Sequence, residues 1–232
     1  MRPTIPDPSS HRRAFTLIEL LTVIAIIGIL AAILFPAVNG VLTHAHKAAV
    51  KNQLSQWTVA VQSYKSDYSY YPIMDGALGS TPGTANVVNA QKFSIALTGT
   101  QLDGTALAVG ATATELVGNT KRRLYYTIAN NELVMTDKTP TGLQDAFGNT
   151  EFAYLYDSNG DGFIKSDDKV YNGAAQSAPT LTSGSGAKFT PDPTNDVNLV
   201  TGIRAGAIFY SPGVGNTDGT PIDSSSAVFS WK

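Results

Sequence analysis

Short oxygen-bearing side chains alternate over the first five positions of one twelve-residue segment. Asp157, Asn159 and Asp161 take its first, third and fifth positions, and a glycine follows at the sixth. Calcium takes about six to eight oxygen ligands, and this spacing curls such side chains around one point. Phe163 would add its backbone carbonyl, and Asp168 would close the ring from the twelfth position. The segment predicts a calcium-binding loop.

Two features separate this loop, residues 157–168, from a helix–loop–helix calcium site. The twelfth position usually carries glutamate, which binds through both oxygens, so aspartate indicates a weaker or differently shaped closure. The flanks, residues 152–156 and 170–173, are typical of strands or turns, so we expect the loop between sheet elements. The same residues would also form a metal-free turn rich in Asx side chains, although repulsion among clustered aspartates favours a cation.

The longest apolar run of the chain, residues 15–38, has Glu19 as its only charged side chain. As a helix this run would extend about 36 Å, enough to cross a hydrocarbon core of about 30 Å. It follows Arg2, Arg12 and Arg13, and such a basic run holds its end of a span in the cytoplasm. The sequence predicts a single membrane span with the rest of the chain outside.

Two simple interpretations account for this apolar run only in part. A cleaved secretory signal has a shorter apolar region, of about 7–15 residues, followed by a small-residue cleavage site. A plain membrane anchor has the right length, but it does not explain an acid near the start of the span, because an acid within a span normally has a partner. In an alternative interpretation of the acid itself, the Glu19 carboxylate only reaches to the membrane surface and has no role in assembly.

The order Arg-Arg-Ala-Phe-Thr-Leu-Ile-Glu-Leu at residues 12–20 resembles the processing site of the type IV pilin and pseudopilin superfamily. The resemblance implies a bacterial inner-membrane precursor, cut by a prepilin peptidase between Ala14 and Phe15 and then methylated at the new amino terminus. It also implies that Glu19 pairs with the freed amino group of Phe15 on a neighbouring subunit. The superfamily usually has glycine before the cut, where this chain has Ala14.

A helical pattern continues beyond Pro36. Proline lacks an amide hydrogen and clashes with the preceding turn, so it should kink or loosen the helix. The resemblance implies that the stretch from Gly28 to Pro36 loosens during assembly.

Later apolar side chains recur at helical spacing and predict one buried stripe. The stripe consists of Val50, Leu54, Trp57, Val61, Tyr64 and Tyr68. The helix should end before Pro72.

Two later segments resemble type II secretion major pseudopilins. Residues 60–72 contain the Tyr, Asp and Tyr-Pro residues that recur where the long helix ends, and residues 145–149 resemble an Asp-Pro-Trp-Gly-Asn segment. The resemblance implies a non-enzymatic subunit of a periplasmic pseudopilus that supports protein export, with other pseudopilin subunits as homo- and hetero-oligomeric partners. The alternatives are a type IV pilus or competence subunit, and a membrane-tethered calcium-dependent binding module or hydrolase.

The remainder of the chain changes character near residue 124. Residues 75–120 are rich in Gly, Thr and Ala and predict loops around a short helix at 92–97. Aromatic and β-branched runs then predict strands. The expected strands are residues 124–128, 132–135, 152–156, 207–210 and 227–231, with a tight turn at 130–131. These elements predict an α+β domain with an antiparallel sheet, and the resemblance implies a pilin-like fold in which the long helix packs on that small sheet.

The order of elements divides the chain into four segments. We expect a leader at 1–14, a membrane and filament-core helix at 15–38, its amphipathic continuation at 39–71 and a periplasmic globular domain at 72–232.

The 232 residues include no cysteine, which excludes disulfides and cysteine chemistry. The net charge of −2 offers no broad surface for nucleic acid. No phosphate loop, dinucleotide fingerprint or catalytic triad pattern indicates an enzyme.

Overall fold

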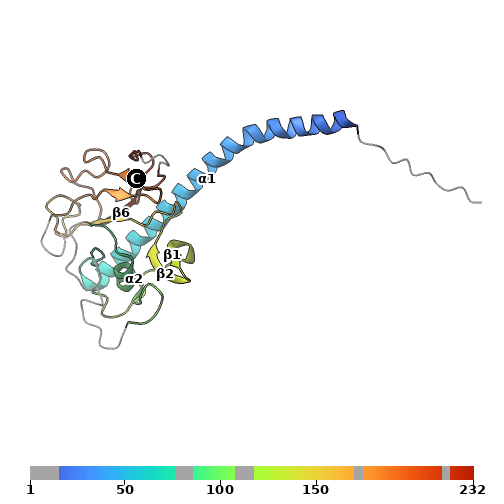
Figure 1. Ribbon diagram of the computed structural model, residues 1–232. Coiled ribbons are helices and arrows are strands. Elements are labelled where there is room, and N and C mark those ends of the chain that lie inside the picture. Colours follow the sequence, from blue (N-terminus) through green and yellow to red (C-terminus); the bar gives the residue numbers. More distant parts are fainter. Residues whose placement is uncertain (1–15, 77–85, 108–117, 170–174, 216–219) are drawn as a thin grey trace, which may run out of the picture. The chain divides into compact units, whose positions relative to one another are not determined.

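The computed structural model describes residues 16–76, 86–107, 118–169, 175–215 and 220–232. The chain divides into two compact units, Met1–His44 and Ala45–Lys232. Helix α1 (Leu17–Tyr68) contributes to both units (Figure 1). The cleavage site and the predicted leader lie outside the described residues.

The first unit contains the apolar part of α1. Its large side chains are exposed, as at Leu21, Ile29 and Phe35. Among the described residues, α1 is the one helix with the length and composition needed to cross a membrane. The backbone is helical through Gly28 and Pro36. The loosening expected between them concerns the assembled filament and stays a prediction.

The second unit is built around the carboxyl half of α1. Five of the six residues of the predicted stripe are fully buried here, because Val50, Leu54, Trp57, Val61 and Tyr64 are each 0% exposed. The sixth, Tyr68, is half-buried and packs against the same core. Such spacing places these side chains on one helix face, and burial of this face holds α1 in the domain. The last helical residue is Tyr68, and Ser69 follows in the left-handed region with φ 65°.

A three-stranded antiparallel sheet separates two cores. Its strands, in spatial order, are β3 (Ala153–Tyr156), β6 (Ala207–Ser211) and β7 (Val228–Phe229). Successive side chains point to opposite faces. Tyr154 and Phe209 therefore pack in the core that contains the α1 stripe, and Leu155 and Ile208 pack in the second core. The predicted α+β class, with a long helix packed against small antiparallel sheets, is confirmed.

Two smaller sheets and a second helix complete the unit. A hairpin of β1 (Leu133–Thr136) and β2 (Thr139–Leu143) and helix α2 (Ala90–Thr98) lie beside the second half of α1 (Figure 1). These elements contribute side chains to the core around the α1 stripe. The strands β4 (Leu181–Thr182) and β5 (Lys188–Phe189) cover the other face of the main sheet. The short helix predicted at 92–97 is confirmed as α2, and Asn89 caps it by accepting the Lys92 N–H at 3.0 Å.

The strand predicted at residues 124–128 is wrong. The N–H groups of Tyr125 and Tyr126 both donate to the Leu97 carbonyl near the end of α2, at 2.7 and 3.1 Å. The carbonyls of the last helical turn need such donors. The ring of Tyr126 also packs edge-on against Trp57. The aromatic run therefore completes a helix terminus and the core, and it joins no sheet.

The turn predicted at residues 130–131 is wrong as well. Residues Asn130–Glu132 form a 3-10 helix, η1, and the chain reverses at Asp137 and Lys138 between β1 and β2. Both residues have positive φ, 50° and 66°, as the hairpin turn that suits the strand twist requires. Strand β2 was not predicted because it contains Pro140 and Gly142, two residue types that weaken strand patterns.

Candidate functional site: the helix start and the acidic loop

The amino terminus of α1 is closed by a capping box. The N–H and the hydroxyl of Thr16 donate to Oε2 of Glu19 at 2.8 and 2.7 Å, and the Glu19 N–H donates to Oγ1 of Thr16 at 3.3 Å. Threonine followed three residues later by glutamate is the sequence signature of this motif. The spacing of Thr16 and Glu19 contains this signal, so the cap could have been predicted.

Glu19 thus has a structural partner within its own chain. Its side chain is exposed, and Oε1 accepts no hydrogen bond from the described residues. Ala14 and Phe15 lie outside those residues. Cleavage between Ala14 and Phe15, and pairing of Glu19 with a neighbouring amino terminus, stay predictions.

The acidic loop, residues 157–168, begins directly after β3. Asp157 is 4% exposed, and its two carboxylate oxygens accept the N–H groups of Gly160 and Gly162 at 2.6 and 2.9 Å. Gly162 has φ 87°, in the region that favours glycine. The loop therefore curls back around its first carboxylate, as the predicted ligand spacing requires.

Asp168 holds the other end of the acidic loop. This side chain is 0% exposed, and its Oδ1 accepts the Ser158 N–H at 2.7 Å while its Oδ2 accepts the Lys165 N–H at 2.7 Å. The carboxylates of the first and twelfth positions are therefore both buried in one loop. Ile164, between them, joins Ile203 through two backbone hydrogen bonds of 2.8 and 3.0 Å, which anchors the loop beside the main sheet.

The remaining predicted ligands have different contacts. Oδ2 of Asp161 pairs with the Lys165 ammonium at 2.6 Å, and this hydrogen bond keeps the pKa of the Asp161 carboxyl below its usual range. Oδ1 of Asn159 accepts the Asp161 N–H at 2.9 Å. The Phe163 side chain is 37% exposed. Across the described residues, no three His, Cys, Asp or Glu side chains gather closely enough to form a metal site by themselves.

The helix start and the fold together define a class. The chain has a pilin-like fold, and its residues 9–35 match the family model described as the prokaryotic N-terminal methylation motif. The methylation motif expected at the amino terminus is thereby confirmed.

A curated relative extends the similarity beyond the motif. The chain is 37% identical over 101 residues to the fimbrial protein EcpC of Eikenella corrodens. The alignment covers 43% of this chain and 65% of the relative, so the chain spans less than two thirds of that protein's length. The comparison with solved structures gave no significant match. Neither matching description names an enzyme.

Proposed function

We propose that this chain is the precursor of a filament subunit, cut between Ala14 and Phe15 by a prepilin peptidase and assembled through its amino-terminal helix. The observation that carries the proposal is a methylation motif directly joined to an apolar, exposed helix. A surface of this size and composition needs an apolar environment. The inner membrane provides it before assembly, and the helices of neighbouring subunits provide it in the filament.

Within this class, we propose a periplasmic type II secretion pseudopilus as the filament, with other pseudopilins as partners. Support comes from the segment that resembles the pseudopilin Asp-Pro-Trp-Gly-Asn motif. The buried carboxylate of Asp145 accepts the N–H groups of Phe147 and Asn149 at 2.8 and 3.0 Å, and it also accepts the Ser211 hydroxyl. This network ties the segment to the end of β6.

The similarity to a fimbrial protein favours a second candidate, a type IV pilus subunit. Deletion of the gene separates the two candidates. Loss of protein export without loss of surface fimbriae supports the pseudopilus, and the reverse result supports the pilus.

Processing is the direct test of the filament proposal. In cells that contain a prepilin peptidase, the mature chain is expected to begin with methylated Phe15, as measured by mass spectrometry of its amino-terminal peptide. Cells without the peptidase should yield a chain that begins at Met1. The variant Ala14→Gly restores the residue that usually precedes the cut and should not lower the processed fraction. Retention of Met1 in both strains would rule out the proposal.

We also propose that the acidic loop binds calcium. Calcium binds carboxylate, amide and backbone carbonyl oxygens, and the loop offers all three kinds. They are the carboxylates of Asp157, Asp161 and Asp168, the amide oxygen of Asn159 and the carbonyl of Phe163. The cation would displace the Lys165 ammonium from Asp161 and offset the repulsion between buried carboxylates. Binding to the folded state alone would stabilise a domain that has no disulfide.

Calcium is expected to raise the melting temperature of the full chain, and a chelator should lower it again. At a concentration one hundred times the dissociation constant, one site adds about 2.7 kcal/mol to the free energy of unfolding. Asp168→Asn should remove this response, whereas Asp167→Asn, at an exposed neighbouring position, should retain it. Lys165→Gln should retain or strengthen the response because Asp161 loses its competing partner. Equal melting and protease resistance with calcium and with chelator would contradict the proposal.

A further inference from the structure

The two ends of the acidic loop are joined by one buried glutamine. Gln176 is 3% exposed. Its side-chain amide pairs with the backbone of Tyr156, the residue before the loop. Oε1 accepts the Tyr156 N–H at 2.9 Å, and Nε2 donates to the Tyr156 carbonyl. The backbone N–H of Gln176 donates to the Asp168 carbonyl at 2.9 Å. Gln176 therefore contacts the chain next to the first predicted ligand and at the last.

The Gln176 side chain takes the place of a neighbouring strand at the end of β3. Strand β3 lies at the edge of the main sheet and pairs with β6 on one side. In an antiparallel pair, alternate residues direct their N–H and C=O groups to the partner strand, and the residues between them direct theirs away. On the outer side of β3, the Tyr154 N–H donates to the Asn86 carbonyl at 2.8 Å. A side-chain amide has the donor and acceptor of a peptide group, so one glutamine satisfies both groups of Tyr156.

A second buried amide, Asn86, holds Gln176 in place. Asn86 is 2% exposed, and its Nδ2 donates to the Tyr154 carbonyl at 3.1 Å and to Oε1 of Gln176 at 3.4 Å. Its Oδ1 accepts the Ser177 N–H at 3.3 Å. Its φ of 51° lies in the left-handed region, which asparagine tolerates better than most residues. Asn86 thus fixes both the side chain of Gln176 and the backbone that follows it.

We propose that Gln176 is a positioning residue for the cation site of the acidic loop, and that it sets the spacing between the carboxylates of Asp157 and Asp168. The inference rests on the calcium binding proposed above. Gln176 acts through the backbone of Tyr156 and Asp168 and is not itself a ligand. Residues that orient metal ligands from outside the ligand set contribute about 10–100-fold to metal affinity.

The direct test is Gln176→Met, which keeps an unbranched side chain of similar length and removes both polar atoms. Calorimetry of the full chain in a neutral detergent measures the affinity for calcium. Circular dichroism measures the melting temperature in the presence of a chelator. We expect calcium affinity to fall about 10–100-fold, because the two ends of the loop lose their common partner.

Asn119→Leu is the matched control. Asn119 is also a buried amide, 0% exposed, and its Nδ2 donates to the carbonyls of Ala96 and Arg123 at 3.0 and 2.8 Å, near the end of α2. Loss of either amide leaves buried backbone groups unpaired. Both variants should therefore melt at a lower temperature without calcium, but only Gln176→Met should weaken calcium binding. The comparison separates ligand positioning from a general loss of stability.

Asn86→Gly tests the support of Gln176 without truncating Gln176 itself. Glycine adopts positive φ without steric cost, so this variant keeps the backbone and loses the side-chain contacts. Calcium binding should be weaker than in the unaltered chain, by a smaller factor than in Gln176→Met. If Gln176→Met does not melt cooperatively, the affinity of Asn86→Gly decides, and an unchanged value would overturn the inference.

Calcium binding by the unaltered chain together with an unchanged affinity in Gln176→Met would overturn this inference alone. An equal loss of affinity in Asn119→Leu would also overturn it, because the effect would then follow stability. If the unaltered chain bound no calcium, the proposed calcium site would fail and this inference with it.

Discussion

Replacement of Trp57 by alanine is expected to lower the free energy of unfolding of the second unit by about 3–5 kcal/mol. Trp57 is fully buried, and its ring lies 4.6 Å from that of Phe93, 4.9 Å from that of Phe152 and 5.6 Å from that of Phe209. These neighbours come from α2, the residue before β3, and β6. Truncation would therefore leave a cavity where the helices meet the sheet.

Val59→Ala is the matched control, because Val59 lies on the same helix with 62% of its surface exposed. Its effect should stay within about 0.5 kcal/mol. Denaturant unfolding of the two variants, followed by circular dichroism, measures the difference. Similar losses for both variants would show that Trp57 does not anchor α1 in the core.

Replacement of Glu19 by glutamine is expected to reduce filament assembly about 100-fold and to leave cleavage largely intact. Glutamine preserves the capping box with Thr16, but it cannot neutralise the amino group of a neighbouring Phe15. An unpaired charge within a membrane costs about 2.5–3.5 kcal/mol, which corresponds to an effect of this size. Sedimentation of sheared filaments measures assembly, and mass spectrometry of the amino-terminal peptide measures processing.

Two further variants separate charge pairing from helix capping. Thr16→Ala removes the cap hydroxyl and keeps the carboxylate, so it should affect assembly much less than Glu19→Gln does. Glu19→Ala removes both functions and should assemble no better than Glu19→Gln. The charge-pairing mechanism would be contradicted if Glu19→Gln assembled normally while Thr16→Ala and Glu19→Ala were impaired. That result would show that Glu19 acts through the helix cap.

The sequence by itself determined the features that depend on neighbours along the chain. Spacings of three and four residues assigned Trp57 and its stripe to the buried face of α1, because a helix brings such positions together. The alternation of oxygen donors predicted a calcium-binding loop at residues 157–168, which stays a prediction, and the structure buries its first and last carboxylates, Asp157 and Asp168. The capping box at Thr16 was equally local and could have been predicted.

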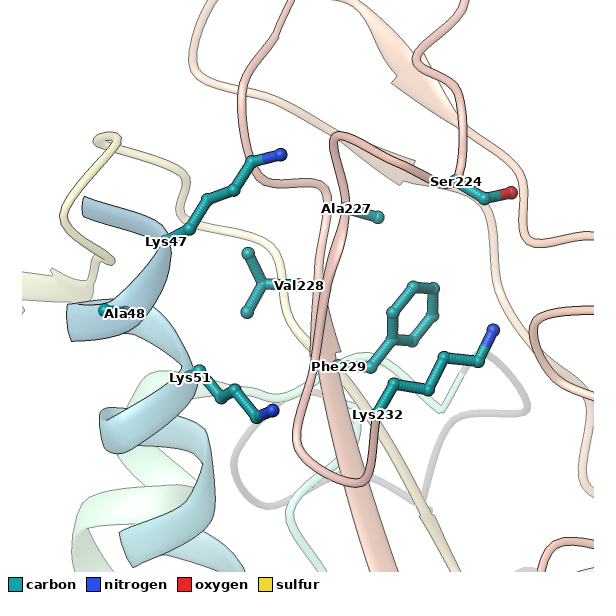
Figure 2. Close-up of a pocket in the computed structure, with 8 residues that line it drawn as sticks. All are labelled: Lys47, Ala48, Lys51, Ser224, Ala227, Val228, Phe229 and Lys232. Carbon is teal, nitrogen blue, oxygen red and sulfur yellow. The ribbon is translucent and has the colours of Figure 1, made fainter. Parts of the chain in front are cut away.

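Only the tertiary structure decided the features that need distant partners. Residues 124–128 have a strand-like composition, yet the N–H groups of Tyr125 and Tyr126 complete the end of α2. Strand β2 exists because the Asp137–Lys138 turn folds it onto β1. A groove of about 320 Å³ is lined by Lys47 and Lys51 of α1 and by Lys232 at the other end of the sequence (Figure 2). No local pattern encodes that meeting, because it arises from packing of the main sheet against the helix.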